Sequence, residues 1–316
     1  MKKIILDTDI GNDCDDAGAM AVLHALADLG KAEILAVTHS VPLKNNSGVG
    51  CIDAINRYYG RADIPVGASK SFAVSTDSYI GVYSGVIASE FPNAYSNGEE
   101  CPDSIRVMRQ VLSDARENSV TLISIGWLTN LSGLLSSLPD DISPLSGAEL
   151  IRQKIEKTVI MGGCFDGSVI THGAAMCAIE GEWNIIQDIP ASIHVASDWR
   201  GAIVFSPFEL GAAMKTGSRL QSETKPENPI RRSYEVHDSF DGRYAWDSVT
   251  VLYAVCPEAG YFKLTPNGKV HIDDKGITTL IPGDNEFPHA VLLEKMPLEQ
   301  VADILDNLTY REPAIK

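Results

Sequence analysis

The sequence predicts one α/β domain over residues 1–316, with an open, mostly parallel, Rossmann-like sheet, helices on both faces and a small peripheral C-terminal hairpin. Three observations support this fold class. Short β-branched runs alternate with longer amphipathic stretches, several short runs are apolar throughout, and no repeat, low-complexity tract or linker divides the chain. Alternating strands and helices form parallel sheets, whose strands are apolar because both of their faces are buried.

The N-terminal third supplies the first strands and helices. Residues 4–6 predict a strand, and residues 15–29 predict a helix with one apolar face, which is made by Ala19, Met20, Leu23 and Leu26. Gly30 is the expected C-terminal cap of this helix. The next strand, helix and short strand are expected at residues 34–37, 52–59 and 64–66.

The middle of the chain continues the alternation. A buried strand is expected at residues 120–125, between helices at residues 106–115 and 128–138. Three further apolar runs predict strands at residues 157–161, 193–196 and 203–205.

Residues 215–243 are the most irregular and polar part of the sequence. A long segment of this kind in a compact domain usually forms a binding loop or lid, so a lid-like segment is expected here. Two short runs that flank an Asp-Asp-Lys-Gly turn predict the peripheral hairpin, at residues 269–272 and 277–281. A terminal helix is expected at residues 298–308.

The composition is that of a globular protein, but the charge is strongly acidic. Lys and Arg total 26 and Asp and Glu total 42, which gives a net charge of −16 at pH 7. No run of basic residues exceeds two, so neither nucleic acid nor an anionic membrane is an expected partner. An acidic chain can bind a cation where several carboxylates converge.

The N-terminal apolar run ends at Asp7, well short of a signal-peptide core, and no stretch is long enough to span a bilayer. The six cysteines include no Cys-x-x-Cys pair, which suits reduced thiols. These features predict a cytoplasmic location. Cys164 and Cys177 are expected to be buried packing residues.

Acidic side chains cluster directly after the first expected strand, at Asp7, Asp9, Asp13, Asp15 and Asp16. Open parallel sheets bind ligands beyond the carboxyl ends of their strands. Carboxylates confined there repel one another unless a cation neutralises them, and hard oxygen ligands favour Ca²⁺ or Mg²⁺. Capping of the following helix explains Asp15 and Asp16 at most, because the other acids precede it.

A strand that ends in Asp-x-Asp is also typical of phosphohydrolases of the haloacid-dehalogenase type, in which the first Asp attacks phosphorus beside Mg²⁺. Such an enzyme needs a later strand-end Ser or Thr, a Lys and an acidic pair. Ser124 fits the first requirement, but no Lys or Asp-Asp follows in a suitable context. An Asp-dependent phosphohydrolase is therefore the less favoured alternative.

The run Asp-Thr-Asp-Ile-Gly-Asn-Asp-Cys-Asp-Asp-Ala at residues 7–17 resembles the signature of the inosine-uridine-preferring nucleoside hydrolase family. Further segments match in the same order: Gly-Trp-Leu-Thr-Asn at 126–130, Met-Gly-Gly at 161–163, Glu-Trp-Asn at 182–184 and Trp-Asp at 246–247. The resemblance implies a Ca²⁺-dependent N-glycosidase that acts on a ribonucleoside or related riboside in purine or pyrimidine salvage. It also implies a homo-oligomer.

The resemblance implies roles for individual residues. Those that would hold Ca²⁺ are Asp9, Asp16, Asp247 and the main-chain carbonyl of Ile125. Those that would contact the ribose are Asp15, Glu182, Asn184 and Met161. Asp9 would also take the proton of the attacking water, and Asp13 is an alternative to Asp15. Negative surroundings of this kind suit the oxocarbenium-like transition state of glycosidic cleavage.

Two departures from the family pattern concern the substrate. Residues 39–42, beginning with His39, stand where the family has Gly-Asn, so a non-catalytic Ca²⁺-dependent nucleoside or sugar binder is an alternative. Trp246 stands where some members have a His that protonates the departing base, and it could stack on that base instead. The other candidates for stacking, protonation or base contact are Trp127, Trp183, His237, Tyr234, Arg243 and, at the mouth of the pocket, His172.

Overall fold

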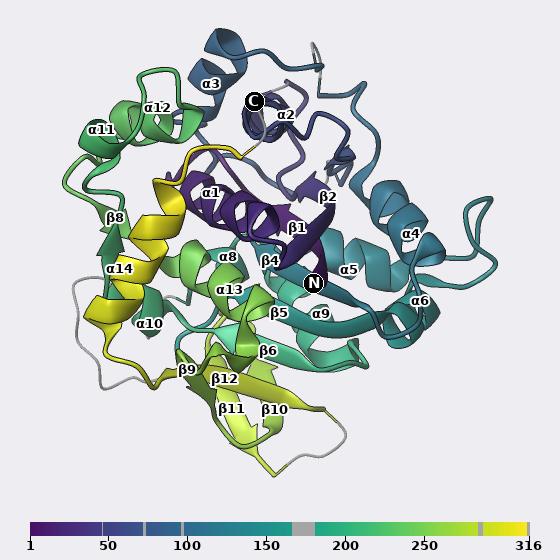
Figure 1. Cartoon of the computed structure of the whole chain (residues 1–316). Helices are drawn as coiled ribbons and strands as arrows, with labels where there is room; N and C mark the ends of the chain where they lie inside the picture. Colours follow the sequence, from purple (N-terminus) through teal and green to yellow (C-terminus); the bar gives the residue numbers. More distant parts are fainter. Residues whose placement is uncertain (46, 72–73, 96–97, 166–180, 284–286, 315–316) are drawn as a thin grey trace.

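The computed structural model describes residues 1–316 except residues 46, 72–73, 96–97, 166–180, 284–286 and 315–316 (Figure 1). Its centre is a sheet in the order β11-β10-β12-β6-β5-β4-β1-β2-β3, with β9 paired to β12. The strands of this sheet are β1 (Lys2–Thr8), β2 (Ala32–His39), β3 (Val66–Ala68), β4 (Val120–Ile125), β5 (Ile155–Met161), β6 (Ile203–Ser206), β9 (Phe262–Leu264), β10 (Gly268–Ile272), β11 (Thr278–Pro282) and β12 (His289–Glu294).

The neighbouring strands β6, β5, β4, β1, β2 and β3 run parallel, and β12 pairs in parallel with β6. Only the pairs that involve β9, β10 and β11 are antiparallel in the described part of the sheet. Thr8 is paired with His39 on one side and with Ile125 on the other. The carboxyl ends of β1, β2 and β4 therefore lie at one edge of the sheet, and the predicted fold class is confirmed.

Helices cover both faces of the sheet (Figure 1). The longer ones are α1 (Asp15–Asp28), α2 (Ser47–Tyr58), α3 (Ser84–Glu90), α4 (Ser104–Asp114), α5 (Thr129–Ser136), α6 (Gly147–Lys154), α9 (Ile189–Asp198), α13 (Trp246–Val255) and α14 (Leu298–Thr309). Side chains of β1 alternate between two cores: Ile4 and Leu6 pack with α1, α2, α13 and α14, while Ile5 packs with α4, α5, α6 and α9. This alternation is expected for a strand buried on both faces.

The strand predicted at residues 193–196 is wrong, because these residues belong to α9. Asp188 caps the helix by accepting a hydrogen bond from the N–H of Ala191 (3.2 Å), and a proline lies in the first turn. The buried side chains recur at a helical spacing, at Ala191, Ser192, Val195 and Ala196. An apolar run of four residues cannot distinguish a strand from a buried helical turn, so the N-terminal signals decide.

Two other predicted elements are displaced along the chain. The helix predicted at residues 52–59 begins earlier, at Ser47, and ends at Tyr58. The strand predicted at residues 64–66 lies at Val66–Ala68, because its ladder with β2 begins at Val66. Pro65 has no N–H to donate, although its carbonyl accepts a hydrogen bond from the N–H of Val37 (3.0 Å).

The segment at residues 215–243 has more regular structure than its sequence predicts. It contains β7 (Lys215–Thr216), which pairs with β8 (Arg243–Tyr244), together with α11 (Leu220–Glu223) and α12 (Pro229–Val236). Helix α12 is capped by Asn228, whose side chain accepts hydrogen bonds from two main-chain N–H groups, and it buries Ile230 and Tyr234. The prediction of an irregular segment is therefore wrong, and its role as a lid stays a prediction.

The predicted hairpin is present as β10 and β11, which extend the far edge of the main sheet, and the predicted terminal helix is present as α14. Within the described residues, no helix combines the length and apolar character needed to cross a membrane. Cys164 is buried as expected. Cys177 and His172 lie outside the described residues.

Candidate active site

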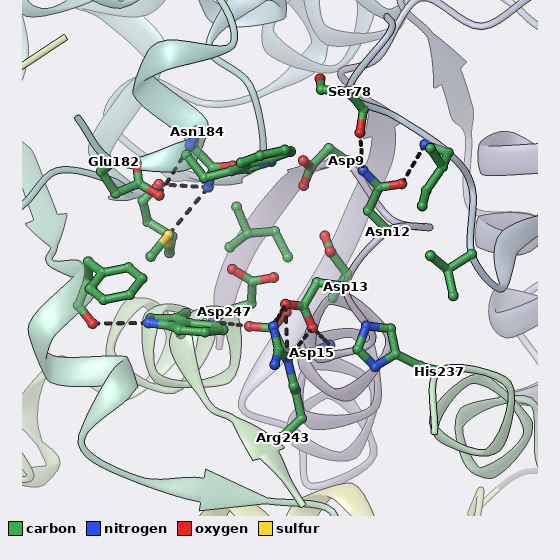
Figure 2. A pocket seen from close by; sticks show the side chains of 18 residues that line it. Asp9, Asn12, Asp13, Asp15, Ser78, Glu182, Asn184, His237, Arg243 and Asp247 are labelled. Carbon is green, nitrogen blue, oxygen red and sulfur yellow. Dashed lines mark hydrogen bonds and ion pairs between the residues drawn. The ribbon is translucent and has the colours of Figure 1, made fainter. Parts of the chain in front are cut away.

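A pocket of about 440 Å³ lies beyond the carboxyl ends of the central strands (Figure 2). It collects residues from the turn after β1, the ends of β4 and β5, the short helix α8 (Trp183–Ile186), the helix α10 (Phe208–Ala212), and the region from α12 to α13. The described residues that line it are Asp9, Asn12, Asp13, Asp15, Asp16, Ser78, Ile80, Val82, Ile125, Met161, Glu182, Trp183, Asn184, Phe208, His237, Arg243, Trp246 and Asp247.

The turn between β1 and α1 brings four aspartates to the pocket. Gly11 has a φ of +141°, and a Cβ there would lie 1.9 Å from the hydroxyl oxygen of Tyr79, so only glycine fits. The residue that caps α1 is Cys14, which makes no side-chain capping hydrogen bond. Simple capping therefore does not account for Asp15 and Asp16, whose side chains face the pocket.

Three carboxylates lie close together at the start of two helices. Asp15 and Asp16 begin α1, Asp247 lies in the first turn of α13, and their oxygen atoms come within 4.8 Å of one another. The N–H of Asp247 donates to Oδ2 of Asp15 (3.2 Å), and the Thr8 hydroxyl donates to Asp16. Burial, followed by the neighbouring negative charges, raises the pKa of all three well above its ordinary value.

Asp9 lies beside this group and is also buried. Its pKa is raised to about 8, mainly by burial and further by the charges of Glu182 and Asp13. A Cβ at Gly126 would approach the main-chain nitrogen of Asp9 to 2.5 Å, so β4 and the acidic turn can pack this closely only with glycine at residue 126. Ile125, the last residue of β4, lines the pocket next to this contact.

Glu182 and Asn184 occupy the side of the pocket opposite Arg243 and His237 in the view of Figure 2. Glu182 caps α8 and accepts hydrogen bonds from the N–H groups of Asn184 (3.1 Å), Ile185 (3.2 Å) and Gly163 (3.2 Å). Its pKa is nevertheless raised to about 7, because burial outweighs these hydrogen bonds. The Asn184 amide donates to the carbonyl of Met161 (3.2 Å), which fixes its orientation.

Arg243 and Asp13 form an ion pair on the pocket wall (Figure 2). The guanidinium donates from Nε to both carboxylate oxygens of Asp13 (2.8 and 3.0 Å) and from Nη2 to Oδ2. Burial acts to raise the pKa of Asp13, but the hydrogen bonds and charge of Arg243 lower it below its ordinary value. Asp13 is therefore the pocket carboxylate that already has a counter-charge.

Aromatic side chains complete the wall next to Arg243. The Trp246 indole donates from Nε1 to the carbonyl of Phe208 (3.0 Å), and the two rings lie 5.2 Å apart. The guanidinium carbon of Arg243 lies 5.1 Å from the centre of the Trp246 ring. Trp183 also lines the pocket, and 46% of its surface is exposed. Planar, partly exposed rings in a pocket can stack on a planar ligand.

The candidate proton donors differ in their placement. His237 lines the pocket, its Nδ1 lies 2.8 Å from the Ser239 hydroxyl, and burial lowers its pKa below the ordinary value. Tyr234 is fully buried beneath the pocket and does not line it, and burial raises its pKa. A buried phenol away from the pocket cannot contact a ligand there.

His39 also lies outside the pocket lining. Its two ring nitrogens contact the carbonyls of Val41 (3.0 Å) and Ile10 (3.3 Å), and burial lowers its pKa to about 4. We assign it a structural role in holding the end of β2 against the acidic turn. Asp7 and Trp127 are fully buried and do not line the pocket either; Asp7 accepts hydrogen bonds from Thr38 (2.6 Å) and Asn130 (2.8 Å). The remaining described site residues expected from the sequence do line it.

Sequence reasoning missed several lining residues: Asn12, Ser78, Ile80, Val82 and Phe208. Asn12 lies inside the acidic run, and its amide binds the loop before α3 by donating to the carbonyl of Ser78 (2.8 Å) and accepting from the N–H groups of Ile80 (2.8 Å) and Gly81 (2.9 Å). The position of Asn12 next to Asp13 could have indicated that it lies at the site. No motif in the sequence marks Ser78, Ile80 or Val82.

Comparisons with known proteins identify a matching family profile and similar folds. The profile of the inosine-uridine preferring nucleoside hydrolases matches residues 4–296. No curated protein sequence matches the chain significantly.

Similar solved structures include a plant nucleoside hydrolase (20% identity, TM-score 0.71, 98% of this chain and 99% of that chain covered). Others are the inosine-uridine preferring nucleoside hydrolase of Bacillus anthracis (19%, 0.72, 98% and 99%) and the purine-preferring ribonucleoside hydrolase of Gardnerella vaginalis (16%, 0.72, 98% and 98%). At these identities the structural matches show a shared fold.

Proposed function

Since this chain belongs to the inosine-uridine preferring nucleoside hydrolase family and is a nucleoside hydrolase, we propose that it cleaves a ribonucleoside or related riboside in a Ca²⁺-dependent reaction. The products are the free base and ribose. The convergence of six carboxylates on one pocket is the observation that carries the proposal. Such a pocket stabilises the positive charge that develops on the sugar during glycosidic cleavage. The family assignment favours this reaction over the phosphohydrolase alternative.

The residues of the pocket fit Ca²⁺. Its preferred ligands are oxygens, and the pKa values of the buried Asp15, Asp16 and Asp247 stay raised although the charge of Arg243 acts on Asp15, so the group still needs a counter-charge. We assign the ion to Asp9, Asp16, Asp247 and the carbonyl of Ile125, with Asp15 beside it. When bound, Ca²⁺ would orient a water molecule and the ribose diol and lower the pKa of that water.

Asp9 is the base that takes the proton of the attacking water. It lines the pocket with the Asp16 and Asp247 carboxylates, and its negative charge raises the pKa of both. Without metal, the pKa of Asp9 is raised to about 8; a neighbouring cation would lower it and keep the carboxylate ionised at neutral pH, the form that accepts a proton. The same residue can therefore bind the ion and accept the proton.

The ribose is held by Asp15 on the metal side and by Glu182 and Asn184 across the pocket. Glu182 has oxygen atoms fixed by main-chain N–H groups, and the Asn184 amide is anchored on Met161. Preorganised groups of this kind lose little freedom when a sugar hydroxyl binds. Met161 contributes an apolar contact to the sugar.

The nucleobase of the substrate occupies the remaining part of the pocket, between Trp246 and the loop residues Ile80 and Val82. Ile80 is 76% exposed, which is unusual for a large apolar side chain and suits a contact made only when substrate binds. Trp183 is placed at the rim of the same pocket. An apolar and aromatic wall suits a planar base better than a second sugar.

A panel of purine and pyrimidine nucleosides, assayed for reducing sugar with and without Ca²⁺, tests this function. We expect sugar release that stops after treatment with a chelator and returns with Ca²⁺. Calorimetry on chelator-treated protein should show Ca²⁺ binding. Binding of Ca²⁺ and ribose without turnover of any riboside would identify a non-catalytic binder, and release of phosphate from an aryl phosphate would identify a phosphohydrolase.

The cellular context follows from the same proposal. A nucleoside hydrolase that frees bases from ribonucleosides would serve purine or pyrimidine salvage in the cytoplasm, with a small-molecule nucleoside as its partner. A homo-oligomer is also expected, and sedimentation of the purified protein tests this expectation.

A further inference from the structure

Acidic side chains greatly outnumber basic ones among the described residues that line the pocket, and this imbalance bears on the reaction. Six carboxylates line the pocket, whereas Arg243 is the only Lys or Arg among the described lining residues. Glycosidic cleavage separates charge between two places, because the sugar becomes positive while the departing nucleobase becomes negative. The carboxylates match the first charge, and only Arg243 has a permanent charge that matches the second.

We propose that Arg243 contacts the departing base and stabilises its negative charge, and that Asp13 is the positioning residue that holds the guanidinium there. This inference rests on the proposed nucleoside hydrolysis and assigns the group that assists the leaving base. The substrate class is thus a riboside with a poor, nitrogen-linked leaving group.

The position of the guanidinium supports this role. Nε and Nη2 are directed at Asp13, so Nη1 of the planar fork is left for another acceptor. The guanidinium also lies over the Trp246 ring, 5.1 Å from its centre, on the wall assigned to the base. In the view of Figure 2, Arg243 lies on the opposite side of the acidic group from Glu182 and Asn184, which are assigned to the ribose.

Asp13 has a separate task. A flexible cation next to Asp15 and Asp247 would pair with them and compete with a bound metal ion, since the charge of Asp15 acts directly on Arg243. The contact of Asp13 with both Nε and Nη2 fixes the guanidinium in one orientation. The remaining carboxylates are then left for the ion and the sugar.

The step balances without a further reactant. The C1′–N bond breaks and its electron pair stays on the base nitrogen, while the oxygen of water forms the new bond to C1′. Asp9 takes one proton from that water and later releases it to solvent. The base takes one proton from solvent, so the net change is nucleoside plus water to base plus ribose.

The experiment compares leaving groups in the Ca²⁺-loaded protein. For Arg243→Ala, kcat on inosine or uridine should fall by about 10²–10³-fold, the usual loss when one stabilising donor is removed. Hydrolysis of 4-nitrophenyl β-D-ribofuranoside should change little, because nitrophenolate leaves without assistance. Arg243→Lys should retain more nucleoside activity than the alanine variant, and added guanidinium ion should restore part of the loss.

The positioning role of Asp13 has its own measurement. Asp13→Asn should weaken Ca²⁺ binding measured by calorimetry and lower activity on nucleosides more than on the nitrophenyl riboside. Arg232→Ala is the matched control, since Arg232 pairs with Glu90 and Glu235 on the surface of α12, away from the pocket, and its removal should leave both activities unchanged. Circular dichroism checks that each variant is folded.

Three results would overturn the inference. Equal losses on the nucleoside and the nitrophenyl riboside would show that Arg243 supports the site generally, and unchanged kinetics would show that it does not act. A loss restricted to nucleoside 5′-monophosphates would make Arg243 a phosphate-binding residue. If the unaltered protein hydrolyses neither riboside, the proposed function itself fails, and this outcome is distinct from the other three.

Discussion

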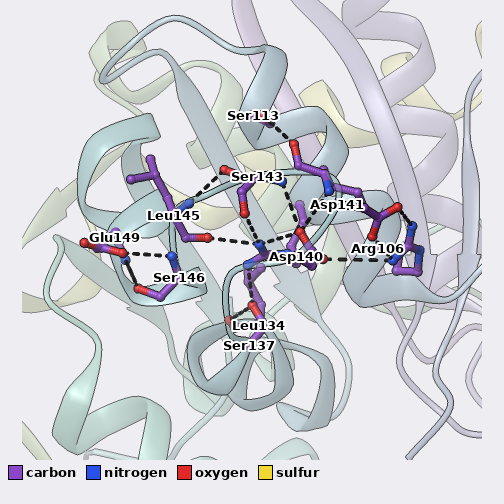
Figure 3. A network of polar contacts seen from close by, with 12 residues as sticks. Arg106, Ser113, Leu134, Ser137, Asp140, Asp141, Ser143, Leu145, Ser146 and Glu149 are labelled. Atoms are coloured by element: carbon purple, nitrogen blue, oxygen red, sulfur yellow. Dashed lines mark hydrogen bonds and ion pairs between the residues drawn. The ribbon is translucent and has the colours of Figure 1, made fainter.

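Two regions of this molecule bury charge, and they do so in opposite ways. The Arg109 network lies between α4 and the residues 137–146 that lead into α6 (Figure 3). Arg109 is 1% exposed, and it donates to both oxygens of Asp140 (2.8 and 2.9 Å), to the Ser137 hydroxyl (2.8 Å) and to the carbonyls of Ser143 (3.2 Å) and Leu145 (2.9 Å). The hydrogen bonds of Arg109 and two main-chain N–H groups lower the pKa of Asp140 to about 2.

The pocket carboxylates show the reverse behaviour. Asp9, Asp15, Asp16 and Asp247 are buried near one another, and among the described lining residues the only arginine or lysine is Arg243, which is paired with Asp13. The pKa values of these four acids rise. A satisfied charge network can specify a local structure. A group of buried charges without counter-charges destabilises the folded state, and such a group is typical of sites where a ligand or a reaction supplies the opposite charge. The direction of the pKa shift therefore separates Asp140, which has a paired arginine, from these four pocket acids.

The largest effect should come from the pocket. Asp9→Asn removes the proposed base, and kcat on a nucleoside should fall by about 10³-fold. The stability of the chelator-treated protein should stay the same or rise, because one unpaired buried carboxylate disappears. Steady-state kinetics and urea denaturation measure the two quantities. Near-normal turnover would contradict the assignment of Asp9 as the group that takes the proton of the attacking water.

The second effect concerns the Arg109 network. Arg109→Ala removes the bidentate partner of Asp140 and the arginine donor of the Leu145 carbonyl, so the free energy of unfolding should fall by about 3 kcal/mol. Urea denaturation measures this loss. At a temperature where the variant remains folded, its kcat on a nucleoside should equal that of the unaltered protein. A selective loss of kcat would mean that this network also serves the active site.

The third effect is a dependence of stability on pH that differs between the two regions. The pKa of Asp9 rises to about 8 and that of Glu182 to about 7, both from burial first, so the folded state without metal binds protons more tightly than the unfolded state. Their contribution to stability is complete below about pH 4 and is lost as the pH rises towards 8. Chelator-treated protein should therefore melt at a lower temperature at pH 8 than at pH 6.

Saturating Ca²⁺ should reduce this difference, because a bound cation favours the ionised carboxylates. Asp140 acts in the opposite direction: its lowered pKa gives a contribution that is present above about pH 4 and is lost as the pH falls towards 2. Calorimetric melting curves across this range test both signs. A melting temperature that rises from pH 6 to pH 8 without Ca²⁺ would refute the interpretation of the pocket.

The smallest effect serves as the control for the Arg109 prediction. Arg106 pairs with Asp141 (2.8 Å) at the edge of the same network, but both side chains are more than half exposed. Water and salt screen such a pair, so Arg106→Ala should shift the melting temperature by no more than about 2 °C. A loss as large as that of Arg109→Ala would show that burial is not the reason for the difference between the two arginines.

Much of the fold was predictable because hydrophobic periodicity is a local property. The run at residues 120–125 became β4 without any shift, and the hairpin and terminal helix lie where expected. Prediction failed at residues 193–196, where four apolar residues fit either a strand or a helical turn and the capping Asp188 decided for the helix. It also failed at residues 229–236, which form a helix although most of their side chains are polar, because only one face of the helix is buried.

The candidate site divides in the same way. The acidic run after β1 and the matching segments around Glu182 and Asp247 could be identified from the sequence, because residue type and order are enough to indicate their chemistry. Three features depend on the packing of distant segments: Asp13 pairs with Arg243 across more than two hundred residues, Tyr234 and His39 lie outside the pocket lining, and Asn12 holds the loop before α3. These outcomes depend on which distant segments pack together, and a local pattern does not contain that information.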